Sequence, residues 1–186
     1  DYSPAVSRDE RNLAFVSDRS GNLDIWVQYL EKEAWKVPFQ VTYHSASDSS
    51  PVWSPDGKKI AFVSLRNDPK GDIYVVDLNE RNESKRVQRL TGSDFFDNAP
   101  AWSPDGKHIA YASRKSGEIN DNVWLINLET GEKGIDAARA KLSFVDALQR
   151  NINTIQKTQL TTEGGSTPSF SADGQYIAFT TGSNGV

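Results

Sequence analysis

The stretch PVWSPDGKKIAF at residues 51–62 recurs as PAWSPDGKHIAY at residues 100–111. Two looser copies read PAVSRDERNLAF at residues 4–15 and PSFSADGQYIAF at residues 168–179. In each copy a serine follows the proline by three residues, an aspartate follows the serine by two, and an alanine with an aromatic residue comes later. The four prolines are 47, 49 and 68 residues apart. Recurrence at such intervals indicates an array of similar structural units.

Two more strand-like runs follow each motif. The first run is DIWV at 24–27, DIYV at 72–75 and NVWL at 122–125. The second run is FQVT at 39–42, VQRLT at 87–91 and TQLT at 158–161. Short runs of β-branched and aromatic residues between Gly, Asp, Asn and Pro clusters favour strands joined by tight turns. Each full unit therefore has four predicted strands.

Four short strands in a period of forty-odd residues are typical of a β-propeller, whose twisted sheets pack face to face around an axis. We therefore predict an all-β fold of four-stranded antiparallel blades, about three and a half in this chain, with one helical insertion. The expected blades span about 1–46, 47–96, 97–164 and 165–186.

The shared motif has a structural explanation within a blade. Proline presets φ, aspartate accepts backbone hydrogen bonds, and glycine adopts positive φ, which together suit a tight turn after the innermost strand. The aromatic residue before the turn is expected to fill the space between neighbouring blades. The motif residues concerned are Trp53, Asp56, Gly57, Trp102, Asp105 and Gly106.

These residues resemble the TolB-type propeller repeat, which also occurs in tricorn-like propellers and in the propellers of prolyl-oligopeptidase-type peptidases. The resemblance extends over nearly the whole chain, with complete motifs at 53–57 and 102–106. The first repeat departs from the pattern with Arg8-Asp9-Glu10, and the fourth has Ala172 in place of proline. The resemblance implies protein–protein binding in a periplasmic or exported setting, and the peptidase relatives would imply a cytosolic gate.

Three blades and two further strands do not close a ring, because natural propellers have about four to eight blades. Open blade edges invite pairing with other strands. We therefore expect the remaining blades to come from sequence outside this chain, which makes the chain a fragment, or from a second copy or a different chain.

The composition excludes several classes of function. A net charge of −4 gives no reason to expect nucleic-acid binding. The absence of cysteine excludes disulfides, thiolate metal sites and cysteine nucleophiles. No apolar run reaches the roughly 20 residues of a spanning helix. His44 and His108 have no second ligand at metal spacing, and no nucleophile elbow of the G-x-S-x-G type is present. We expect no catalytic residue, cofactor or metal.

A repeated polar set suggests a binding surface. Basic residues follow the second strand of each blade, and aspartates lie three residues before two of the prolines: Arg19, Asp48, Arg66, Asp97 and Lys115. In an up-and-down sheet the loops after the second and fourth strands emerge on one face, so these groups should share one rim. Two interpretations stay open: mutual ion pairs that order the loops, or a charged funnel that docks a partner.

Two functions are compatible with these features. The first is a non-enzymatic scaffold for protein–protein interaction, with a partner of unknown identity and a periplasmic or exported location. The second is the substrate-gating propeller of a peptidase whose catalytic domain is not in this chain.

The third blade contains a long insertion after its third strand. Ala138, Leu142, Val145, Leu148, Ile152 and Ile155 recur at steps of three and four, which is one face of a helix over about 135–153. The strand order predicts that the insertion emerges beside the Pro-Asp-Gly turns, opposite the charged rim. The helix is expected either to pack on the underside of a blade or to dock a partner.

Substitution of the helix face separates these alternatives. Replacing Leu142, Val145 and Leu148 with serine or glutamine should lower the free energy of unfolding if the helix packs on the propeller, since each buried aliphatic side chain contributes roughly 1.5–3 kcal/mol. Retained stability with lost association, measured by urea denaturation and by binding, would instead indicate docking. No effect on either quantity would contradict both.

Overall fold

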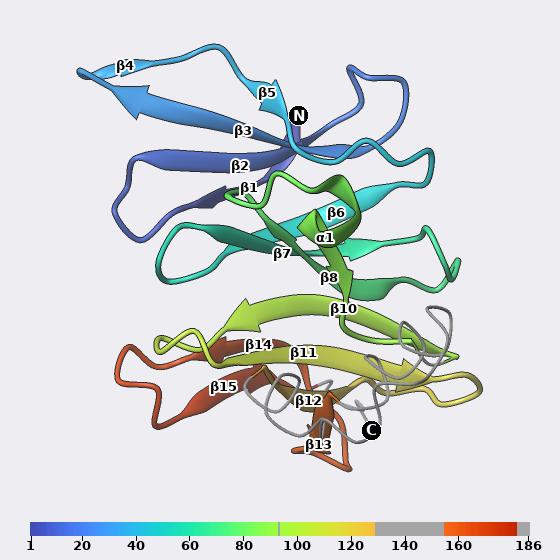
Figure 1. Ribbon diagram of the computed structural model, residues 1–186. Coiled ribbons are helices and arrows are strands. Elements are labelled where there is room, and N and C mark those ends of the chain that lie inside the picture. Colours follow the sequence, from blue (N-terminus) through green and yellow to red (C-terminus); the bar gives the residue numbers. More distant parts are fainter. Residues whose placement is uncertain (93, 129–154, 182–186) are drawn as a thin grey trace, which may run out of the picture.

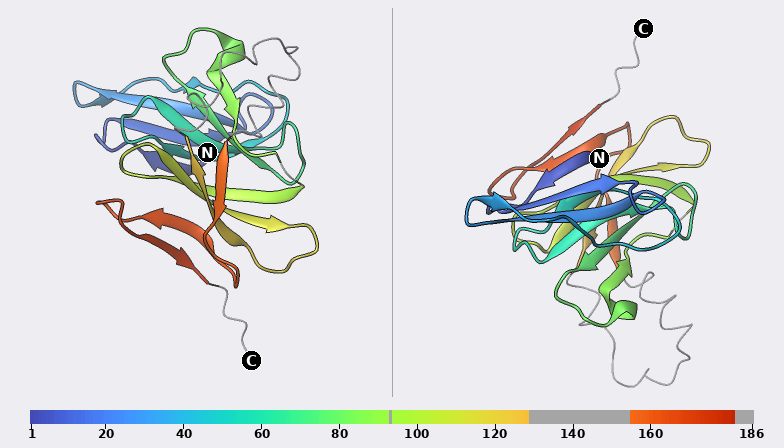
Figure 2. Two further views of the ribbon diagram at one scale, coloured as in Figure 1. Left: turned by 60° about the horizontal axis from the view of Figure 1, so that its bottom comes forward. Right: turned by 90° about the horizontal axis from the view of Figure 1, so that it is seen from above.

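The computed structural model describes residues 1–92, 94–128 and 155–181 of the chain, and within them it is almost entirely antiparallel sheet (Figure 1). The predicted all-β class with four-stranded antiparallel sheets is confirmed. In Figure 1 the sheet of β1 to β5 lies at the top, the sheet of β6 to β9 lies below it, and the third sheet lies at the bottom together with β14 and β15; Figure 2 shows the arrangement from two other sides.

Each of the first three sheets is a meander of consecutive strands. The first contains β1 (Tyr2–Val6), β2 (Asn12–Ser17), β3 (Asp24–Glu31) and β5 (Phe39–Gln40), with β4 (Ala34–Trp35) pairing on the far end of β3. The second contains β6 (Asp48–Trp53), β7 (Lys59–Ser64), β8 (Asp72–Asp77) and β9 (Val87–Arg89). The third contains β10 (Phe95–Trp102), β11 (His108–Lys115), β12 (Asn122–Asn127) and β13 (Gln156–Gln159). A two-stranded sheet of β14 (Ser166–Phe170) and β15 (Ile177–Thr180) follows.

Two details differ from the sequence-based expectations or go beyond them. A single helical turn, α1 (Glu83–Arg86), lies between β8 and β9, where no helix was predicted from the sequence. The predicted helical insertion at about 135–153 lies outside the described residues, as do Leu142, Val145, Leu148 and Ile152.

The turn after the innermost strand is built in the same way in all four sheets. In the second sheet Ser54 donates its hydroxyl proton to Asp56 at 2.6 Å, and Asp56 accepts the Lys58 amide at 3.1 Å. Gly57 has φ of +68°, and Glu10 adopts φ of 60° at the same position of the first sheet. The turn therefore persists in the first repeat without the proline and the glycine.

A second repeated contact fastens the fourth strand to the third. The Oγ1 of Thr91 accepts the amide of Ile73 at 2.9 Å and lies 3.4 Å from Oδ1 of Asp72. The equivalent threonines, Thr42 and Thr161, accept the amides of Ile25 and Val123 at 3.0 and 2.9 Å. Each threonine hydroxyl thus accepts a backbone N–H of the third strand at the place where the pairing with the fourth strand ends.

The innermost strands share a bulge just before the repeated proline. The residue preceding each proline has positive φ although none is glycine: Ser3, Ser50, Ala99 and Thr167. The pairing register with the second strand shifts at the same place in every sheet. A bulge of this kind bends the strand and re-aims the side chains around it.

The core lies between the sheets, where their apolar faces meet. One cluster joins the first two sheets through Val16, Ile25, Ile60 and Phe62, among others. Another joins the second and third sheets through Val63, Ile73, Ile109 and Tyr111, among others. Trp53 lies between the first and second sheets. It is 8% exposed, and its indole N–H donates to the carbonyl of Ala5 in the first sheet at 3.0 Å.

Removing the Thr91 hydroxyl should test the strand contact. In Thr91→Val the Ile73 amide loses its partner in a fully buried position, so we expect the free energy of unfolding to fall by about 1–3 kcal/mol. Urea denaturation measures it. Thr162→Val, at an exposed position, is the control and should change stability by less than about 0.5 kcal/mol. Equal effects of the two substitutions would contradict the proposed role.

Candidate interaction surfaces

In the second sheet, Arg66 folds back against its own blade. Its Nη2 lies 2.9 Å from Asp48 Oδ2, and its Nε donates to Ser64 Oγ at 2.8 Å. The guanidinium carbon lies 5.5 and 4.8 Å from the ring centres of Phe62 and Tyr74. The two ion-paired side chains are 14% and 0% exposed. Arg66 is therefore held by charge, hydrogen bond and ring contacts together.

The first sheet repeats this arrangement closer to solvent. Arg19 Nη2 lies 2.7 Å from Asp1 Oδ2, Nε donates to Ser17 Oγ at 2.8 Å, and the guanidinium lies over Phe15 and Trp26. Asp1 is not among the residues predicted from the sequence for this rim. The signal was available, because Asp1 precedes its proline by three residues, as Asp48 does.

The third sheet departs from the pattern. Asp97 accepts the Ser113 hydroxyl at 2.5 Å, but its Oδ2 has no hydrogen-bond partner among the described residues although Asp97 is 1% exposed. Lys115 occupies the position of Arg19 and Arg66, is exposed, and makes no ion pair with Asp97 among those of the described residues. The structure thus brings Asp48 and Arg66 together and leaves Asp97 and Lys115 apart. A partner-binding role for this rim stays a prediction.

Buried charge also lies between the second and third sheets. Burial raises the pKa of Asp72 to about 6, against the lowering influence of Arg89, whose Nη2 is 2.7 Å away. Burial also raises the pKa of Asp97 and lowers that of Lys157, whose charge acts on both aspartates. Asp72, Arg89 and Lys157 are not among the site residues predicted from the sequence.

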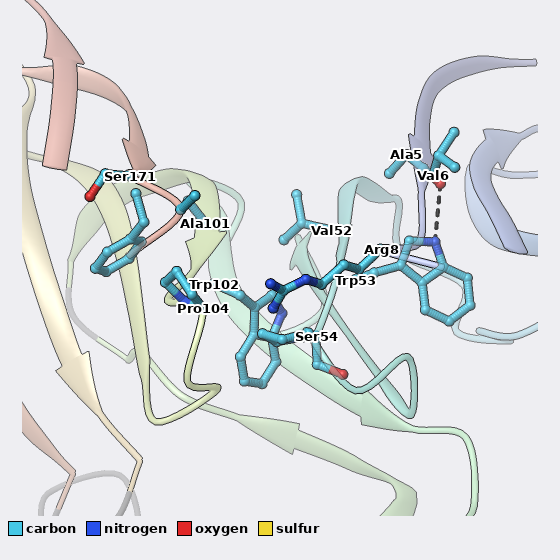
Figure 3. Close-up of a pocket in the computed structure, with 13 residues that line it drawn as sticks. Ala5, Val6, Arg8, Val52, Trp53, Ser54, Ala101, Trp102, Pro104 and Ser171 are labelled. Carbon is cyan, nitrogen blue, oxygen red and sulfur yellow. Dashed lines mark hydrogen bonds between the residues drawn. The ribbon is translucent and has the colours of Figure 1, made fainter. Parts of the chain in front are cut away.

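An open pocket of about 440 Å³ runs along the innermost strands of all four sheets, at the end where the turns begin (Figure 3). Apolar side chains make up most of its wall, including Val6, Val52, Trp102 and Phe170, and Arg8 is its one charged lining residue. Val6 is 57% exposed. The pocket offers an accessible apolar surface built from four separate segments of chain.

The residues of the repeated motif lie in the wall of this pocket or in the turns next to it. Trp53 and Trp102 both line it, and the Trp102 indole nitrogen is buried without a hydrogen-bond partner in the described part of the chain. Asp56 and Asp105 lie in the turns beside it, where the Ser103 hydroxyl holds the pKa of Asp105 below its usual value. Gly57 and Gly106 have φ of +68° and +72°.

The described residues contain no group of three or more His, Asp or Glu side chains that could hold a metal ion. His44 Nδ1 accepts the Ala46 amide at 3.0 Å, and His108 Nδ1 lies 3.9 Å from Asp105. Both histidines thus have local structural contacts. Within the same residues no helix is long and apolar enough to cross a bilayer.

Comparison with protein-family models and with curated proteins finds TolB-type relatives. The family model of the TolB beta propeller domain matches residues 2–134. The Tol-Pal system protein TolB of Ruthia magnifica is 32% identical over 91 residues, which cover 48% of this chain and 19% of that protein. The chain therefore matches about a fifth of the length of this curated relative.

Solved structures share the fold. The crystal structure of TolB from Acinetobacter baumannii superposes with a TM-score of 0.62 at 23% identity, covering 100% of this chain and 38% of that one. A puromycin-hydrolyzing peptidase of Mycobacterium tuberculosis superposes with a TM-score of 0.56 at 18% identity, covering 90% of this chain and 23% of that one. At such identities the likeness concerns the fold alone.

The raised pKa of Asp72 predicts how stability depends on pH. The carboxyl has a pKa of about 6 in the folded protein and 3.8 as its ordinary value, so folding favours the protonated form. Stability conferred by this group is therefore lost as the pH rises from about 4 through 6. Relative to Asp72→Asn, the wild type should lose on the order of 1–3 kcal/mol over that interval, measured by urea denaturation at constant ionic strength.

The exposed Asp18→Asn is the control for loss of one carboxylate from the chain. A difference between wild type and Asp72→Asn that stays constant with pH, or grows in favour of the wild type as the pH rises, would contradict this account.

Proposed function

Since the chain belongs to the TolB β-propeller domain family, we propose that it is a non-catalytic scaffold that binds another protein as part of a larger propeller. Curated relatives are named as TolB of the Tol-Pal system, and the chain covers only part of their length. The proposal therefore includes further blades supplied by other sequence or by another chain.

The pocket along the innermost strands is the observation that carries this proposal. It collects Val6, Val52, Trp102 and Phe170 from four sheets into one open, mainly apolar surface. Accessible apolar surface with aromatic residues is typical of protein-binding sites. The polar groups near it are turn serines and Arg8, which suit a polypeptide better than a charged small molecule.

The charged rim is proposed as a second contact region. Arg66 and Asp48 neutralise each other, so they contribute mainly by fixing the loops that carry them. Arg19 and Asp1 are 39% and 53% exposed and are accessible to a partner. Asp97 and Lys115, which do not pair with each other, remain candidates for contact with a partner.

The docking helix with Leu142, Val145, Leu148 and Ile152 is a further proposal that concerns residues outside those described.

We propose a periplasmic or exported location, on the strength of the Tol-Pal relatives alone. A peptidase gate remains the alternative, supported only by the fold shared with the Mycobacterium tuberculosis peptidase. No cofactor or metal is part of either proposal.

Site-specific photo-crosslinking tests the scaffold function. Benzoylphenylalanine at Val6, in the pocket wall, should give a crosslink in the native host to another component of the Tol-Pal system. The same residue at Val37, which is 86% exposed and outside the pocket, is the control and should not. Mass spectrometry identifies the product.

Identical products from both positions, or none from Val6, would contradict the pocket as a binding surface. A crosslink from Val6 to a hydrolase domain in the same polypeptide would instead support the peptidase gate.

A further inference from the structure

The first two blades each fill one internal space with their own arginine. The guanidinium carbon of Arg19 lies 5.3 and 4.8 Å from the ring centres of Phe15 and Trp26, and its Nη2 pairs with Asp1. Arg66 does the same with Phe62, Tyr74 and Asp48. The repeat therefore specifies a site for a cation, bounded by an aromatic pair, a serine hydroxyl and an aspartate.

In the third blade the same space is a pocket. Four of its lining residues are the repeat counterparts of Ser64, Asp72, Tyr74 and Arg89, which stand in equivalent register positions of the second blade. These four are Ser113, Asn122, Trp124 and Gln159. The pocket has a volume of about 260 Å³. It lies where the second blade places its arginine.

The third blade has Lys115 in place of the arginine, but it retains the aspartate that pairs with the arginine in the other blades. Asp97 precedes its proline by three residues, as Asp1 and Asp48 precede theirs. Asp97 is 1% exposed, one of its carboxylate oxygens accepts the Ser113 hydroxyl, and the other has no hydrogen-bond partner in the part of the chain that the structure describes. An unpartnered buried carboxylate oxygen is costly, and most such groups in proteins are satisfied. Among the described residues Asp97 therefore lacks the direct ion pair that Asp48 makes with Arg66, and Lys157 is the cation whose charge acts on it.

Asp97 does not itself line the pocket, but Ser113 does, and its hydroxyl donates to Asp97 as a link between the two. We propose that this pocket binds the guanidinium group of an arginine side chain presented by a partner protein, with Trp124 as the stacking surface. Asp97 is the counter-ion, reached beside Ser113 as Arg66 reaches Asp48 beside Ser64. The inference rests on the proposed function in that the arginine comes from a protein bound to this domain.

Arginine fits the pocket better than other cations. A planar guanidinium stacks on aromatic rings and donates to carboxylate and hydroxyl oxygens at once, whereas an ammonium group is a compact, strongly hydrated charge. Phe95 also lines the pocket, with its ring centre 6.5 Å from that of Trp124, and Glu118 adds a second acidic group to the lining. Lys115 is the chain's own cation at this position, and it does not pair with Asp97.

Binding of short peptides to the full 186-residue chain tests the proposal. The probe is acetyl-Gly-Arg-Gly-amide, and the readout is the NMR cross-peak of the Trp124 indole, assigned with Trp124→Phe. We expect a saturable shift with a dissociation constant of about 1 mM, which corresponds to a single anchoring group. The peptide with neutral citrulline in place of arginine should give no saturable shift, and the lysine peptide should bind more weakly.

Two variants address the site itself. Asp97→Asn keeps an acceptor for Ser113 but removes the charge, and should weaken arginine binding at least about tenfold. Lys115→Arg should fill the pocket from within, abolish peptide binding and raise Tm by about 2–4 °C. The exposed Lys58→Arg is the matched control and should change neither.

Absence of a saturable shift, an equal response to the citrulline or lysine peptide, or unchanged binding to both Asp97→Asn and Lys115→Arg would overturn the arginine site. If this site fails while the crosslink from Val6 forms, the scaffold function stands without it. If the peptide binds and the crosslink is absent, the site stands and the pocket along the innermost strands loses its role.

Discussion

The sheets of this protein bury their apolar faces against one another, and the second sheet does so on both faces. Val16 and Ile25 are fully buried only because Ile60 and Phe62 of the next sheet pack against them. The second interface follows the same rule around Ile73 and Ile109. Stability is thus shared between adjacent sheets, as in other stacked repeats. The surfaces that remain for function are the inner wall and the loop rims.

Local polar contacts make each blade rigid enough for this packing. The Ser-Asp pair closes the turn after the innermost strand, and the threonine that follows the fourth strand satisfies an amide of the third. The first repeat keeps the turn although Glu10 replaces glycine, which shows that Ser7 and Asp9 are sufficient to define it. Because these contacts recur in each blade, the backbone is similar from blade to blade, and the blades differ mainly in individual side chains.

The largest such difference concerns charge. Arg66 is enclosed by its own blade and neutralised by Asp48, whereas among the described residues Asp97 of the third blade makes no direct ion pair and has Lys157 as a nearby charge. A repeat array can change one position of one blade without disturbing the others, because each blade contacts only its neighbours. A single blade can therefore differ from the others at one repeat position, as the third blade does with Lys115 in place of arginine. Such positions are where a function specific to one blade is expected.

The sequence by itself determined the strands, the turns and the blade-to-blade tryptophan, because turn chemistry and alternating hydrophobicity are local and recur at a fixed period. It placed Arg66 and Asp48 on one rim for the same reason. Only the tertiary structure decided that Arg19 pairs with Asp1, that Asp97 makes no such ion pair within the described residues, and that four strands share an open inner pocket. These features depend on how loops and strands distant in sequence meet, which periodicity does not encode.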